Sequence, residues 1–197
     1  MSSAKFVIRP EDFLVNDLFK DSSCFLELAK EHEGDDPVAA RRYVRASMLA
    51  AFTALEALVN TLLVDLENAE VPEPEEGAFN HENRVKLAKG GNIERRGQRF
   101  RPLDQRIRML HRRRGGEPVP KGSPIQKALY DATEPRNKLV HPRPSQVPYS
   151  WLTAARAKLC LVACVQLAEA LGGRALISLD DWEKLSGLKL NDASGAK

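Results

Sequence analysis

The segment that decides the fold is residues 37–68, PVAARRYVRASMLAAFTALEALVNTLLVDLEN, whose pattern predicts one long helix. Its apolar side chains recur at spacings of three and four residues, which is the period of one helix face. They are Met48, Phe52, Leu55, Val59, Leu62 and Leu66. Asp36 suits the N-cap and Pro37 the first helical position, while Pro72 and Pro74 end the helix. The helix should be about 48 Å long, from the usual rise per residue.

Further helices are predicted on both sides of this segment. They cover residues 10–33, 102–114, 123–141 and 148–171. In the third of these, Pro135 should kink or restart the helix. Asn80 can cap a short helix that Gly90-Gly91 would close, with a loop over residues 90–100. No stretch alternates convincingly as a strand would.

These elements predict an all-α protein, an antiparallel helical bundle around two long central helices. The low aromatic content, 6%, agrees, because a core of Leu, Val and Ala suits packed helices better than a sheet. A single domain should span residues 1–197. Its core is expected at about 10–173, with a basic insertion at about 84–116 and a loose tail at about 188–197.

The basic residues are concentrated in one part of the chain. The net charge is only +3, but residues 84–114 contain 12 basic residues and two acids. Residues 65–76 carry six acids and no base. The two stretches could simply be solvated and pair with each other, or the basic one could bind phosphates. In the second case Arg95, Arg96 and Arg99 are the expected RNA-binding residues.

The three cysteines do not suggest a disulfide framework, because they are few and odd in number. Cys160 and Cys164 lie four residues apart in an apolar stretch and are expected in the core rather than in a zinc site. No cofactor or metal is expected. No apolar run approaches the roughly 20 residues that cross a bilayer, and no signal peptide is recognisable. The chain is therefore expected to be cytoplasmic and independent of a membrane.

One hexapeptide carries a candidate site: Arg136-Asn137-Lys138-Leu139-Val140-His141. An Arg-x4-His pattern alone is weak, since about 0.4 matches are expected by chance in this composition. A second match, from Arg106 to His111, illustrates the problem. Requiring Asn after the Arg lowers the chance expectation to about 0.015 and selects Arg136.

This hexapeptide, late in a helical chain and before a final long helix, resembles the signature of HEPN domains. The resemblance implies a bundle of four or five helices, usually paired as a homodimer. It also implies metal-independent endoribonuclease activity in the catalytic members, with the motifs of two subunits facing each other. Arg136, Asn137 and His141 match the family's pattern and would be the catalytic residues. The long basic insertion is not typical of the family.

The chemistry of the hexapeptide agrees with that role. Asn137 and His141 would share a helix face, and His141 would lie at a helix C-terminus, where the dipole favours its protonated form. Histidine can exchange a proton near neutral pH, and a guanidinium can hold phosphate oxygens in a fork. The alternative is structural: Arg136 and His141 could satisfy helix carbonyls and the carboxylate of Glu134.

A polar stripe interrupts the apolar long helix at Thr53, Glu56 and Asn60. Buried charges need partners, so Glu56 and Asn60 could support the site by holding Arg136 or His141. A stripe that faces solvent is the alternative.

Three functions remain open from the sequence. The first is an endoribonuclease, such as a toxin or defence effector, acting as a homodimer on RNA and restrained by an antitoxin. The second is a non-catalytic helical module that dimerises or binds another protein. The third is a sequence-independent nucleic-acid binder that uses the basic segment alone.

Overall fold

The computed structural model describes residues 10–69, 81–87, 93–115, 118–140 and 149–171. The protein is an all-α helical bundle to which a two-stranded hairpin is added. Its contacts divide the chain into two units, Met1–Leu58 with Val119–Lys197, and Val59–Pro118. The long helix α2 (Pro37–Ala69) contributes to both, and each unit is described separately.

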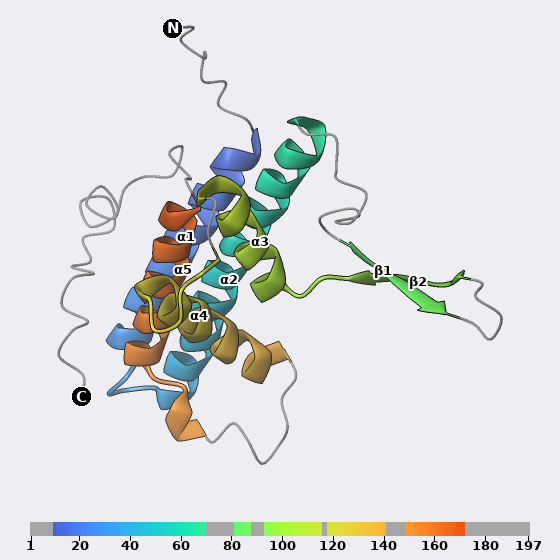
Figure 1. Cartoon of the computed structure of the whole chain (residues 1–197). Helices are drawn as coiled ribbons and strands as arrows, with labels where there is room; N and C mark the ends of the chain where they lie inside the picture. Colours follow the sequence, from blue (N-terminus) through green and yellow to red (C-terminus); the bar gives the residue numbers. More distant parts are fainter. Residues whose placement is uncertain (1–9, 70–80, 88–92, 116–117, 141–148, 172–197) are drawn as a thin grey trace, which may run out of the picture. The chain divides into compact units, whose positions relative to one another are not determined.

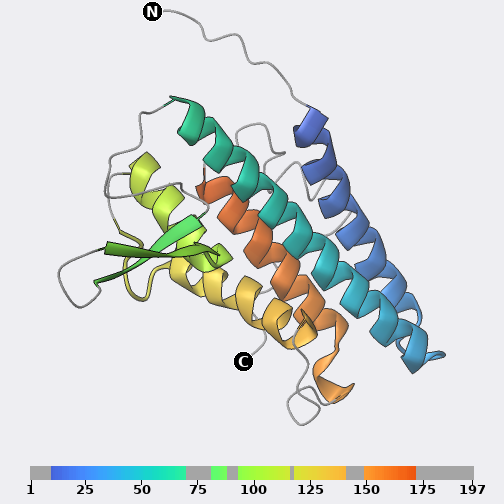
Figure 2. The same cartoon turned by 90° about the vertical axis from the view of Figure 1, so that its right-hand side faces the viewer.

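The first unit contains α1 (Pro10–Glu31), the first part of α2, α4 (Pro124–Val140), the short 3-10 helix η1 (Tyr149–Trp151) and α5 (Ala154–Ala170). Helix α5 contacts both α1 and α4, and Figure 2 shows it side by side with α4. Figure 1 shows the same helices from the side. Most of α5 is buried, including Leu161, Val165 and Leu167, so this helix forms the centre of the unit.

The start of α2 follows the sequence prediction. The backbone N–H groups of Val38 and Ala39 both donate to Asp36 Oδ1, at 3.0 Å each. These bonds, that of Ala39 foremost, lower the pKa of the Asp36 carboxyl, because they favour its charged form. Two helices are then joined inside the core, where the Ser22 hydroxyl of α1 donates to the Ser47 carbonyl of α2 at 2.9 Å. This bond satisfies a polar group that would otherwise be costly to bury.

Helix α4 runs through the expected break at Pro135 without interruption. Pro135 is buried in the unit. A proline inside a helix costs about 3 kcal/mol through its missing N–H and its ring. Packing of this helix against α5 offsets that local penalty, so of the two expected outcomes, a kink or a restart, the restart does not occur.

The second unit contains the end of α2, strands β1 (His81–Leu87) and β2 (Ile93–Phe100), and α3 (Leu103–Gly115). The strands pair antiparallel, with His81 opposite Phe100 and Leu87 opposite Ile93. The prediction of a short helix after Asn80 and a loop over residues 90–100 was therefore wrong. The strands satisfy their backbone groups by pairing with each other, which needs no alternating apolar pattern. The pair Gly90-Gly91 between two such segments also favours a hairpin turn, but from the sequence it was interpreted as the end of a short helix.

One helix, Pro37–Asp65, is long and apolar enough to cross a membrane by length and composition alone. It is an exception to the expectation that no such stretch exists in the chain. Its apolar window has a mean hydropathy of 1.7, and 56% of that window is buried inside the protein. A core helix passes the same test, so this observation is weak evidence for a membrane.

Candidate active site at the end of helix α4

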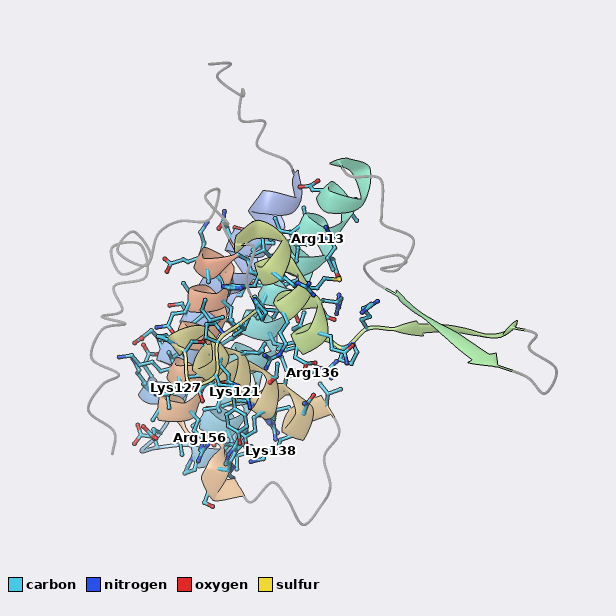
Figure 3. All side chains as sticks on the ribbon, viewed as in Figure 1. Arg113, Lys121, Lys127, Arg136, Lys138 and Arg156 are labelled. Atoms are coloured by element: carbon cyan, nitrogen blue, oxygen red, sulfur yellow. The ribbon has the colours of Figure 1, made fainter. Side chains whose placement is uncertain are left out.

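The last turn of α4 carries the described part of the hexapeptide (Figure 3). Arg136 is half-buried, Asn137 is exposed, and the helix ends at Val140. His141 follows directly in the chain and lies outside the described residues, as does its predicted shared face with Asn137. The structure thus locates two of the three predicted catalytic residues on one helix end.

Two contacts fix the guanidinium of Arg136. Its Cζ lies 5.2 Å from the centre of the Phe52 ring on α2. Its Nη1 donates to Asn137 Oδ1 at 3.2 Å. Phe52 is itself only 5% exposed, so the ring is a firm support. A guanidinium that packs against an aromatic ring still has N–H donors at its edges that can bind an oxyanion.

The neighbouring Lys138 makes a different set of contacts. Its Nζ forms an ion pair with Glu134, one turn earlier on α4. The same ammonium lies 4.9 Å from the centre of the Trp151 ring. The guanidinium of Arg156 lies 5.2 Å from that ring as well. Glu134, which could have held Arg136 or His141, is thus engaged with Lys138.

The polar stripe on α2 divides among different partners. The Thr53 hydroxyl donates to the carbonyl of Leu49 at 2.8 Å, within the helix. Glu56 is half-buried. The side-chain oxygen of Asn60 accepts a hydrogen bond from Nη1 of Arg106, inside the second unit. The observed partner of Asn60 is therefore a buried arginine rather than a residue of the hexapeptide.

That arginine begins the second Arg-x4-His match. Arg106, on α3, is only 1% exposed, and His111 follows on the same helix, half-buried. A guanidinium that is removed from solvent and bound to Asn60 has a structural function. From the sequence, this second match was set aside because no Asn follows Arg106.

The predicted RNA-binding arginines lie on the hairpin. Strand β2 carries Arg95, Arg96 and Arg99, and its backbone places Arg99 opposite Glu82 and Arg95 opposite Val85. Strand pairing therefore places one of these arginines opposite an acid and another opposite an apolar residue.

No group of three or more His, Cys, Asp or Glu that could hold a metal ion exists among the described residues. The three cysteines form no disulfide. Cys160 and Cys164 are buried in α5, and a hydrogen bond with Cys160 together with burial raises the pKa of Cys164 well above its ordinary value. Its thiol is therefore neutral at physiological pH and a poor nucleophile or metal ligand.

Two aromatic side chains were not among the predicted site residues. Phe52 was assigned to the apolar face of the long helix, where its spacing places it, and no local pattern indicates that it meets Arg136. Trp151 lies just before α5 and is in contact with two cations that are 13 and 5 residues away in the chain. No protein-family model, curated protein or solved structure matches this chain.

Proposed function

We propose that this protein is a metal-independent endoribonuclease of the HEPN type, acting at the interface of a homodimer. The observation that carries the proposal is the guanidinium of Arg136, held between the Phe52 ring and Asn137 at the end of α4. His141 follows this helix end by one residue. RNA cleavage by the ribose 2′-OH can use a guanidinium that holds phosphate oxygens and a histidine that transfers a proton, and this hexapeptide contains both residue types.

The reaction is a transesterification at phosphorus. The 2′-oxygen attacks the adjacent phosphate and loses its proton to a base, while the 5′-oxygen leaves and gains a proton from an acid. The products are a 2′,3′-cyclic phosphate and a free 5′-OH. His141 supplies one of the two proton transfers, and His141 of the partner subunit supplies the other. Arg136 stabilises the charge that develops on the phosphoryl oxygens.

A homodimer brings the two histidines to one phosphate, and exposed apolar side chains support such pairing. Val140, directly before His141, is 44% exposed, and Tyr130 on the same helix is 64% exposed. Val140 ends α4 and Tyr130 lies nearer its middle, and exposed apolar groups on a helix favour an interface along it. Under this proposal the protein acts in the cytoplasm on RNA, needs no cofactor, and is restrained by an antitoxin or another partner protein.

The hairpin of β1 and β2 is proposed to bind the same RNA. We propose that Arg95, Arg96 and Arg99 add backbone contacts that lengthen the bound RNA, because basic side chains on a strand can follow a phosphate chain.

One assay tests the proposal. Purified full-length protein is incubated with end-labelled single-stranded RNAs of varied sequence in excess EDTA, and the new ends are identified. We expect cleavage that survives EDTA, spares DNA of the same sequence and leaves 2′,3′-cyclic phosphates. Absence of cleavage on all RNAs would count against the proposal.

A non-catalytic interaction module is the second candidate. The contact of Arg136 with Phe52 favours it, because an arginine that covers an apolar ring stabilises a fold without any reaction. A protein that is dimeric, or that binds a partner, and leaves every RNA intact would establish this alternative.

A further inference from the structure

A cluster of cations that the proposed reaction does not use lies at the C-terminal end of α4. It consists of Lys138 on α4, Trp151 on η1 and Arg156 on α5. Figure 3 labels its two cations, at the lower ends of the two helices. Trp151 is 8% exposed, and both cations rest against its ring, at 4.9 Å and 5.2 Å from its centre. Three elements of the first unit therefore converge on one indole.

The cluster holds two like charges close together. Since each cation lies about 5 Å from the same ring centre, they are at most about 10 Å apart. Like charges at that separation repel each other unless an anion lies between them. Glu134 compensates Lys138, but Arg156 is exposed and forms no ion pair with a carboxylate among the residues that the structure describes. The cluster thus carries an uncompensated positive charge in a fixed position.

The tryptophan acts as a support rather than as a base-stacking platform. Its ring is almost fully buried, so a nucleobase could not lie on it without displacing a cation. Its indole N–H finds no acceptor among the described residues. A buried donor without a partner is unfavourable, so the ring keeps its place because of its packing and its two cations. What the cluster offers to a ligand is therefore charge and hydrogen-bond donors, without base specificity.

The cluster lies beside the candidate active site. Lys138 is two residues after Arg136, and residues at that spacing point to different sides of a helix. Arg136 is directed to Phe52 of α2, and Lys138 to Trp151 before α5. A helix with its side chains is about 10–12 Å wide, so the two cations would contact different phosphates of one strand.

We propose that Lys138 and Arg156, held in place by Trp151, form a subsite for a backbone phosphate of single-stranded RNA next to the phosphate at Arg136. This inference rests on the proposed function for its choice of RNA. It also specifies the path of the bound RNA away from the reacting phosphate, across the end of α4 toward the start of α5. The subsite sets affinity and register without reading sequence.

The test measures binding separately from cleavage. A fluorescently labelled RNA with 2′-O-methyl groups throughout cannot be cleaved, and its anisotropy with full-length protein gives Kd at several salt concentrations. The test variant is Lys138→Gln with Arg156→Gln. The matched control is Lys20→Gln with Lys30→Gln, which removes the same charge from α1, on the opposite side of α5 in Figure 2.

We expect the test variant to bind more weakly and its log–log salt slope to fall by about 0.7 for the contact of the uncompensated Arg156, and by about 1.4 where the phosphate also takes Lys138 from Glu134. The control should keep the wild-type slope. Trp151→Phe, which retains a ring for both cations, should also keep the slope, whereas Trp151→Leu should lower it. Melting temperatures of all variants show which of them are folded.

Two results would overturn the subsite. One is a wild-type protein that does not bind the methylated RNA. The other is a folded Lys138→Gln, Arg156→Gln variant whose slope equals that of the control. The two proposals fail separately. A protein that shows the expected slopes but leaves unmodified RNA intact keeps the subsite and loses the endoribonuclease. A protein that cleaves RNA with an unchanged slope keeps the reaction and loses the subsite.

Discussion

The side chain of Arg136 packs on a buried ring, and the proposed reaction also requires it to hold phosphate oxygens. A planar guanidinium can do both, because its N–H donors lie at its edges and remain available while the group packs on a ring. A lysine keeps the charge and the apolar stem but lacks the fork. Comparing arginine with lysine at position 136 therefore separates the contribution of charge from that of bidentate binding.

The first prediction follows from that difference. Arg136→Lys should lower kcat for RNA cleavage by about 10², the range seen when one donor to a developing oxyanion is lost. The melting temperature should change little, because the lysine stem still covers Phe52. Single-turnover kinetics and thermal unfolding measure the two effects. A folded Lys variant with wild-type kcat would show that the fork is not used in the reaction.

The buried Arg106 leads to the second prediction. Asn60→Ala removes an acceptor from a guanidinium that is 1% exposed, and hydrogen bonds to charged groups contribute about 1.5–3 kcal/mol. Urea unfolding should show a loss of stability of that size. Asn60→Asp keeps an oxygen facing Arg106 and should lose less. Equal losses in both variants would mean that this hydrogen bond does not stabilise the second unit.

At the level of elements, the N-terminus of α2 gives a prediction about how stability depends on pH. The pKa of Asp36 is lowered by bonds from Ala39 and Val38, so its contribution to stability is present above the ordinary carboxyl pKa and is lost as the pH falls through the lowered value. Asp36→Ala should therefore lower the melting temperature at neutral pH, and Asp36→Asn, which still caps, should lower it less. The difference between wild type and Asn variant should vanish in acid. A difference that persists there would contradict this origin.

Elements with strong local signals could be predicted from the sequence. The long helix was expected over residues 37–68 and is found at Pro37–Ala69, because its apolar period lies within this segment and its cap and terminal prolines lie close by in the sequence. The hairpin was missed, since strand pairing depends on a partner elsewhere in the chain. The last helix was expected from residue 148 and begins at Ala154, where Thr153 caps it by accepting from the Arg156 N–H at 3.3 Å.

For the candidate site, too, the sequence predicted the local part and missed the contacts from other elements. Arg136 and Asn137 lie on one helix end, as the hexapeptide indicated. The supports of its cations, Phe52 and Trp151, belong to other elements, and only the packing of the first unit brings them to α4. Asn60 showed the limit of reasoning from one helix face, since its partner proved to be Arg106.

At the level of the whole molecule, the proposed reaction needs two chains. Light scattering at tens of micromolar should give twice the chain mass of 21.9 kDa. Replacing the exposed Val140 by Lys should shift the protein toward monomer, because a charge would then be placed in an apolar interface. Val38→Lys, on α2, is a control with a similarly exposed side chain. A wild-type protein that is monomeric at this concentration would contradict the dimeric site.

The central claim is that the hexapeptide at the end of α4 cleaves RNA, and a comparison of two histidines tests it most directly. Cleavage rates of wild type, His141→Ala and His111→Ala are measured on one RNA in EDTA, with circular dichroism and light scattering on each protein. His141→Ala should lose about 10²–10⁴ in rate, the usual contribution of a positioned acid or base, while its helicity and mass persist. His111→Ala, in the second Arg-x4-His match, should cleave at nearly the wild-type rate. A His141→Ala protein that cleaves as fast as wild type would contradict the account.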